Sequence, residues 1–219
     1  MAGEDFDMSN NTITQADHER ITCAIRAAES TTSGEIFAVV AHASDDYFYV
    51  AGFMAGLWSL LSGALVWLGA LAFGYDIGGG IIVSAQMAAF VLSLVMFQLR
   101  PQWRLLFVPR SVAYRRASAN AVKQFLAHGI HTTQARSGVL LFVSLAERYA
   151  EIVADEGIDE HVDQSVWNTM VEHLIDHAAK GEVADGFIQV IGEAGAVLAP
   201  HFPPQPEGRN ELDDLLVEI

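Results

Sequence analysis

A long apolar stretch from Tyr47 to Leu99 constrains this chain more than any other feature of its sequence. Asp76 is the only charged residue in it. A helix needs about 20 apolar residues to cross the hydrocarbon of a bilayer, so the stretch has room for two spans. We expect one span at about 49–73 and a second at about 77–99, with a glycine-rich turn between them. The sequence therefore predicts a two-helix transmembrane hairpin.

Basic residues predict the orientation of this hairpin. The turn at 74–80 has no Lys or Arg, whereas five arginines directly follow the second span: Arg100, Arg104, Arg110, Arg115 and Arg116. Cytoplasmic loops of membrane proteins carry an excess of Lys and Arg, which places both termini in the cytoplasm. The polar, acidic start of the chain is unlike a cleavable signal peptide. We expect a multi-pass protein of the bacterial inner (cytoplasmic) membrane, with the lipid bilayer as a partner.

Small residues form one face of the first span, with Gly52, Gly56 and Gly63 on it. Such a face lets membrane helices approach each other closely. It can pack against the second span of the same chain, or it can form a homodimer of two chains. The two spans contain no Lys, Arg, Glu or His. We therefore expect an anchor and not an ion or proton path.

The charge balance excludes one class of partner. The net charge is −15, from 12 Lys and Arg against 27 Asp and Glu. Binding to the phosphate backbone needs clustered basic residues, so we expect no nucleic-acid partner. The single cysteine, Cys23, cannot form an internal disulfide.

Helical and extended patterns flank the hairpin on both sides. Helical periodicity is found at 14–30, 111–128, 163–180 and 183–199. Short β-favouring runs are found at 35–41, 139–145 and 149–154. Neither a lone strand nor a two-stranded hairpin is stable alone, so these strands should share one sheet. The sequence predicts an α/β fold, a small mixed sheet of three or four strands flanked by helices and interrupted by the transmembrane hairpin.

The expected organisation has five segments. A polar tail at 1–13 precedes the first part of the α/β domain at 14–46, which contains a helix and a strand. The hairpin at 47–99 follows, and the main part of the domain covers 100–203. The acidic tail at 204–219 is expected to be solvated, with a docking peptide as the alternative.

Part of the chain resembles the TPM domain family. The resemblance rests on the hydrophobic strand at Gly138, the acidic residues 155–157 after the paired strand, and Asp185-Gly186 before the last helix. It implies an α/β fold. Some members of the family are described as acid phosphatases or calcium binders, and others as assembly or accessory factors. The segment after the second strand is often glycine-rich in the family, whereas here it is ADEGIDEHVDQ.

An acidic loop is the strongest candidate site. Five carboxylates fall where a strand ends and a helix begins: Asp155, Glu156, Asp159, Glu160 and Asp163. Hard cations such as Ca²⁺ bind to several oxygen ligands on a flexible loop, and sites gather at strand ends in α/β sheets. The alternative is a solvated loop whose acids stabilise the N-terminus of the next helix.

Two hypotheses of function follow. In the first, a membrane-anchored TPM-like domain acts as an interaction or accessory module for other membrane proteins. In the second, the chain is a calcium-dependent phosphatase that uses the acidic loop 155–163. The sequence contains no self-standing catalytic motif, so it names no catalytic residues.

Overall fold

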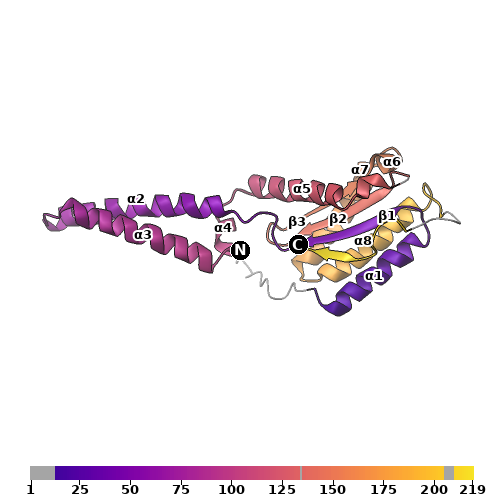
Figure 1. The fold of residues 1–219 in the computed structure, drawn as a ribbon, viewed down its shortest axis with the longest axis horizontal. Helices are drawn as coiled ribbons and strands as arrows, with labels where there is room; N and C mark the ends of the chain where they lie inside the picture. Colours follow the sequence, from indigo (N-terminus) through magenta and orange to yellow (C-terminus); the bar gives the residue numbers. More distant parts are fainter. Residues whose placement is uncertain (1–12, 134, 205–209) are drawn as a thin grey trace. The chain divides into compact units, whose positions relative to one another are not determined.

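The computed structural model describes residues 13–133, 135–204 and 210–219 (Figure 1). Its packing divides the chain into two compact units. Unit 1 combines Met1–Ser44 with Tyr114–Ile219, and unit 2 is Asp45–Ala113. Apart from Ile13, the expected polar tail lies outside the described residues. One unit is thus interrupted in sequence by the other.

Unit 1 is built on a mixed sheet with the strand order β3-β2-β1-β4. The strands are β1 (Glu35–Ala41), β2 (Gly138–Ser144), β3 (Tyr149–Ala154) and β4 (Leu216–Glu218). β1 runs parallel to both β2 and β4, whereas β2 and β3 form an antiparallel pair. β1 and β2 are neighbours although all of unit 2 lies between them in sequence. The predicted class, a small mixed sheet flanked by helices, is confirmed.

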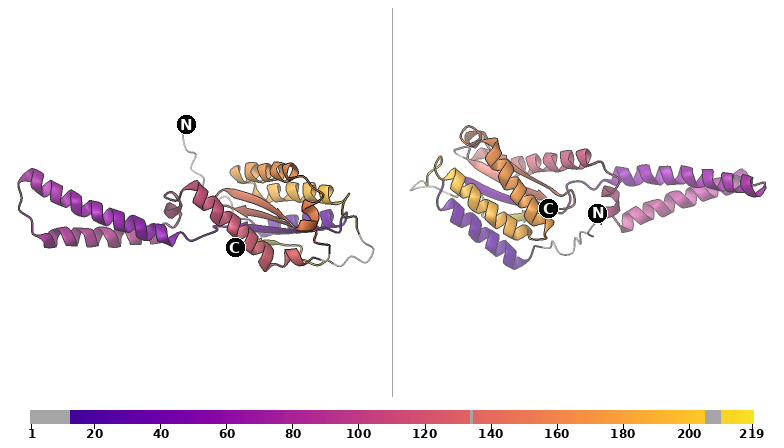
Figure 2. Two further views of the ribbon diagram at one scale, coloured as in Figure 1. Left: turned by 90° about the horizontal axis from the view of Figure 1, so that it is seen from above. Right: turned by 180° about the vertical axis from the view of Figure 1, so that it is seen from behind.

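Helices cover both faces of this sheet (Figure 2). They are α1 (Gln15–Glu29), α5 (Arg110–Ala127), α7 (Gln164–Ala179) and α8 (Val183–Leu198). Side chains such as Ile36 and Leu141 pack against α1, α7 and α8, whereas Phe37 and Phe142 pack against α5. Every residue of β1 and β2 is buried, as expected for strands covered on both faces.

The N-terminus of α1 is fixed by a capping box. Thr14 Oγ1 accepts from the backbone N–H of Asp17 at 3.2 Å, and an Asp17 carboxylate oxygen accepts from the backbone N–H of Thr14 at 3.1 Å. The hydrogen bonds from Thr14 lower the pKa of the Asp17 carboxyl. The sequence spacing predicts this start of the helix.

The expectation of a solvated acidic tail is wrong for the end of the chain. Leu216 is only 3% exposed and belongs to β4, which pairs with β1. The backbone N–H of Ile219 donates to the Val40 carbonyl at 3.0 Å, and the His42 N–H donates to the Ile219 carbonyl at 2.8 Å. The physical reason is that β1 would otherwise present an unpaired edge of backbone groups.

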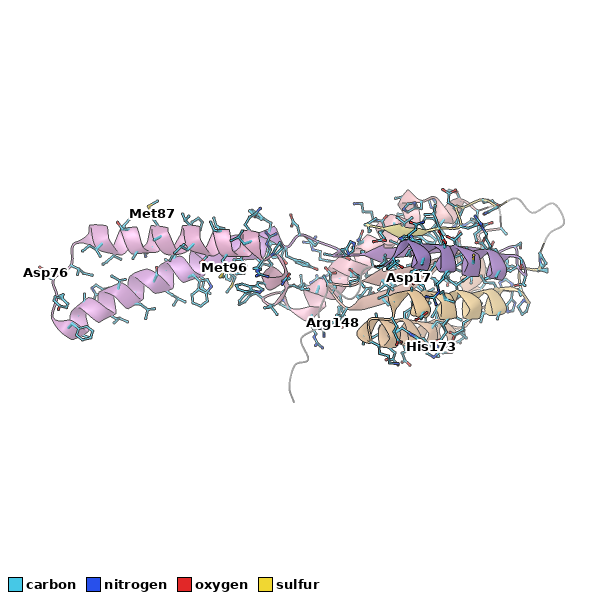
Figure 3. The ribbon with its side chains drawn as sticks, turned by 90° about the horizontal axis from the view of Figure 1, so that it is seen from below. Asp17, Asp76, Met87, Met96, Arg148 and His173 are labelled. Atoms are coloured by element: carbon cyan, nitrogen blue, oxygen red, sulfur yellow. The ribbon has the colours of Figure 1, made fainter. Side chains whose placement is uncertain are left out.

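Unit 2 contains two long apolar helices, α2 (Phe48–Phe73) and α3 (Gly79–Leu99), followed by the short α4 (Gln102–Leu105). α2 and α3 lie side by side, and Asp76 is in the turn between them (Figure 3). Both helices are long and apolar enough to cross a membrane, with mean hydropathies of 1.7 and 2.1. Their bounds agree with the two expected spans.

The glycines of α2 differ in their surroundings. A Cβ atom at Gly63 would lie 2.5 Å from the side-chain nitrogen of Gln86 on α3, so this glycine allows the two helices to approach. The Ser59 hydroxyl donates to the Gln86 carbonyl at 3.0 Å in the same region. At Gly52 and Gly56 a Cβ would meet nothing within 4 Å. The homodimer stays a prediction, which the mass of the detergent-purified chain tests.

Arg104 lies inside unit 2. Its guanidinium donates to the Asp46 carbonyl at 2.9 Å and to the Phe97 carbonyl at 3.2 Å, and stacks over the Phe48 ring. These bonds join Asp46, two residues before α2, to Phe97 in the last turn of α3. One of the five arginines after the second span therefore closes the base of the hairpin.

Candidate functional site

The acidic loop begins where β3 ends. Asp155 is 4% exposed, and its carboxylate accepts from the Glu156 backbone N–H at 2.8 Å as the N-cap of α6 (Glu156–Asp159). Its second oxygen lies 3.1 Å from Nε of Arg136. This buried carboxylate is therefore engaged by one backbone donor and one cation.

The loop around Arg136 packs closely against α6. A Cβ atom at Gly157 would lie 2.7 Å from the Arg136 carbonyl oxygen and 2.8 Å from that of Ala135, so only glycine fits there. Arg136 itself has a positive φ of 52°, which is unusual for a residue with a side chain. Its Nη2 also lies 3.4 Å from Glu156. The ion pair with Asp155 thus holds two loops together.

The other carboxylates of the loop point elsewhere. Asp163 is the N-cap of α7 and accepts from the Ser165 backbone N–H at 2.8 Å, and the hydrogen bonds from Ser165 lower the pKa of its carboxyl. Asp159 and Glu160 are exposed. Within the described residues, no group of three or more His, Cys, Asp or Glu side chains is placed to hold a metal ion. The structure brings Asp155 and Glu156 to Arg136 and does not gather the five acids around one point.

A hydroxyl and carboxylate cluster, which the sequence patterns did not predict, lies at the carboxyl ends of β1 and β2. The Ser144 hydroxyl donates to Glu147 at 2.5 Å, and the Ser44 backbone N–H donates to the same carboxylate at 3.0 Å. The two serine hydroxyls are 2.8 Å apart. The carboxyl ends of neighbouring parallel strands are the usual place of sites in such sheets, and this rule could have found the cluster.

This cluster has a structural role. Ser144 is fully buried and Glu147 nearly so, so neither reaches a substrate from outside. The carboxylate of Glu147 binds the last residue before the chain leaves unit 1, Ser44. The cluster therefore fixes the exit of the chain from β1 toward unit 2.

Two histidines on α7 contact α8 (Figure 3, where His173 is labelled). His173 Nδ1 lies 3.1 Å from a carboxylate oxygen of Glu193, and His177 Nε2 lies 3.0 Å from the amide oxygen of Gln189. Although side chains four residues apart on a helix can chelate zinc, these imidazoles are engaged by polar side chains of the neighbouring helix. Their arrangement links α7 to α8.

A second carboxylate cluster holds the segment before β4. Glu35 accepts from the backbone N–H groups of Glu211 and Leu212, both at 3.3 Å, and burial raises the pKa of its carboxyl. Glu29 accepts from the Ile36 N–H at 2.9 Å. Burial, together with the neighbouring Glu35 and Asp214 carboxylates, raises the pKa of Glu29 to about 8. This cluster ties the last segment of the chain to α1 and β1.

Comparison with known proteins gives one family match and one similar solved structure. Residues 98–197 match the family model of the TPM domain. The fold is similar to the NMR structure of the BA42 protein from the psychrophilic bacterium Bizionia argentinensis, with a TM-score of 0.57 at 17% sequence identity and full coverage of both chains. At this identity the likeness shows the fold alone. The comparison with curated protein sequences gives no match.

The family match contains β2, β3, the acidic loop and α7 in full. These elements include the strand at Gly138 and the acidic residues 155–157 that carry the resemblance in the sequence. Over residues 98–197, the chain is therefore similar to the TPM domain family.

Proposed function

We propose that this protein is a TPM domain anchored in a lipid bilayer by the hairpin of α2 and α3. The domain acts there as an interaction or accessory module for other membrane proteins. The proposed membrane anchor rests on one observation, the exposed apolar surface of the hairpin. The accessory role is supported by the anchor, which confines the acidic domain to the surface of the membrane.

The hairpin exposes large apolar side chains on both helices. Leu65 is 69% exposed and Phe73 is 80% exposed, and they are accompanied by Phe53, Trp67, Met87 and Leu92. Soluble proteins rarely present so large a continuous apolar surface to water. A bilayer would cover it, and an α-helix pairs its backbone groups within the segment everywhere except at its two ends.

The charges at the two ends of the hairpin support one orientation. The turn at the tip carries Asp76 and no basic residue, whereas Arg100 and Arg110 follow α3 at the base. By the positive-inside rule, the base and unit 1 lie in the cytoplasm of a bacterial cell and the tip lies outside its inner membrane.

Extraction and cysteine labelling test the anchor and its orientation. The full chain should stay in the membrane fraction at pH about 11 and dissolve only in detergent. Cys23, the single and exposed cysteine, should react with a membrane-impermeant maleimide only after the cells are opened. In a Cys23→Ser background, Asp76→Cys should react in intact cells.

The two halves of this experiment control each other. Chain released by alkali would contradict the anchor. Labelling of Cys23 in intact cells, with Asp76→Cys protected, would indicate the opposite orientation. Chemical crosslinking in native membranes tests the accessory role, and products that contain only this chain would count against it.

The alternative is a calcium-dependent phosphatase at the acidic loop. Its support is the family model, which is named for a phosphatase, and the buried Asp155 beside Arg136. The donor set of the described residues does not fit a calcium site as it stands, because Asp155 is bound to Arg136 and Asp163 to a helix N-terminus.

A calcium titration decides this alternative. If Ca²⁺ binds at the loop, millimolar calcium should raise the melting temperature of the detergent-purified chain by a few degrees. The Asp155→Asn/Asp159→Asn variant should lose that rise, and Glu172→Gln/Asp176→Asn, exposed acids of α7, should keep it. A melting temperature unaffected by calcium removes the site and the phosphatase hypothesis that depends on it.

A further inference from the structure

An apolar groove opens on unit 2 where the hairpin meets α4. Its volume is about 540 Å³, within the range of small-molecule sites. α2 contributes Trp58, Leu61 and Leu65 to its walls, and α3 contributes Leu92 and Met96. The segment after α3 closes one end with Trp103, Leu106 and Phe107.

The closing segment is unusual because its apolar side chains are exposed. Leu106 is 77% exposed, and Trp103 and Phe107 are also exposed. Aromatic and aliphatic side chains in this position, directly after a span, are typical of the boundary between hydrocarbon and headgroups. The groove therefore begins at the level of the headgroups and continues along the two spans.

The segment that closes the groove lies in a basic part of the sequence. Residues 77–146 contain seven of the chain's 12 Lys and Arg and no Asp or Glu, although the whole chain has a net charge of −15. Arg100 and Arg110 flank the groove-lining segment in sequence, and both are exposed. Within the part of the chain that the structure describes, neither forms an ion pair.

Arg104 adds a buried positive charge to this region. Arg104 is nearly buried within unit 2, and its guanidinium donates to three neutral oxygens, those of Asp46, Phe97 and the Gln98 side chain. Within the described residues, no carboxylate forms an ion pair with it. An anion at the mouth of the groove would be attracted by Arg100, Arg104 and Arg110 together.

We propose that this groove binds one anionic phospholipid. An acyl chain lies along the apolar walls, and the phosphate lies at the mouth, bound by Arg100 and Arg110. The charge complementarity selects an anionic lipid over a neutral one, and a bilayer supplies such lipids at the required depth. The site rests on the proposed membrane anchoring and adds a specific ligand to it.

Tryptophan quenching by brominated lipids tests the site. Trp58 and Trp103 line the groove, whereas Trp167 is buried in unit 1 and Trp67 is exposed outside the groove. We therefore use the full chain with Trp67→Phe, in detergent. Brominated phosphatidylglycerol should quench the fluorescence saturably, at a concentration about 30-fold lower than brominated phosphatidylcholine.

Two variants separate charge from shape. Arg100→Gln/Arg110→Gln should bind phosphatidylglycerol no better than phosphatidylcholine, whereas Lys123→Gln/Lys180→Gln, with the same loss of charge in unit 1, should keep the preference. Ala89→Phe, which fills the groove, should weaken quenching by both lipids.

Three results would overturn the proposal. They are equal quenching by the two lipids, an arginine variant that keeps the preference, and a copurifying protein that lipid cannot displace from the groove. Loss of the anchor itself would be seen separately, as chain released from membranes by alkali. The two failures are therefore distinguishable.

Discussion

Replacing Leu216 by alanine should lower the free energy of unfolding of unit 1 by about 2–4 kcal/mol. Leu216 is 3% exposed and packs into the larger core of the sheet, between β1 and the helices that cover it. Its neighbour Leu215 is 41% exposed. Leu215→Ala should therefore change the free energy by less than about 0.5 kcal/mol, as for an ordinary surface substitution.

The matched pair isolates the role of β4. Both variants remove the same atoms from adjacent residues, so their difference reports burial and not composition. Trp167 lies in the core of unit 1 and serves as its probe when the tryptophans of unit 2 are replaced by Phe. Equal effects of the two substitutions on denaturant unfolding would show that the chain end is not docked as a strand.

The elements with strong periodic patterns could be predicted from the sequence. The bounds expected for β1 and β3, 35–41 and 149–154, are those found. The two long helices of unit 2 begin and end within two residues of the expected spans. These segments succeed because a continuous β-favouring run, or a helix that is apolar on all sides, leaves a sequence pattern that few other structures produce.

The short elements could not be predicted. β4 has three residues, too few to show an alternation, and it is a strand only because the edge of β1 is available. α6 has four residues within the acidic loop. Arg104 has the same residue type and spacing as its exposed neighbours, and only the packing of unit 2 distinguishes it.

The acidic loop illustrates a different limit. Sequence spacing shows that five carboxylates are close along the chain, but it does not show in which direction they point. Asp155 and Asp163 each accept a hydrogen bond from a backbone N–H group at the start of the following helix. Capping a helix in this way competes with metal binding for the same carboxylate. The alternative stated from the sequence, acids that stabilise a helix N-terminus, describes these two residues.

The stability of unit 1 should fall as the pH rises from about 5 to about 8. Burial raises the pKa of Glu29 from 4.5 to about 8, so in this range the folded chain keeps a proton that the unfolded chain has released. The unfolded state then binds fewer protons than the folded state, and the free energy of unfolding decreases with pH. Glu35 acts in the same direction, because burial also raises the pKa of its carboxyl.

Glu29→Gln should remove most of this dependence. The amide oxygen can still accept from the Ile36 N–H, and a neutral side chain has no charge to bury beside Glu35 and Asp214. Because Glu29 is partly exposed, solvent reduces the effect, and we expect a gain of about 1–3 kcal/mol at pH 8.5 and little change at pH 5. Melting temperatures measured across this range check the prediction.

Glu19→Gln is the matched control, since Glu19 is an exposed residue of the same helix. It should leave the pH profile unchanged. The prediction fails if Glu29→Gln melts at a lower temperature than the parent chain at pH 8.5. It also fails if the melting temperatures of the two chains change with pH at the same slope. Arg26, which lies 2.9 Å from Asp214, would then be balancing the whole cluster and keeping Glu29 ionised in the folded state.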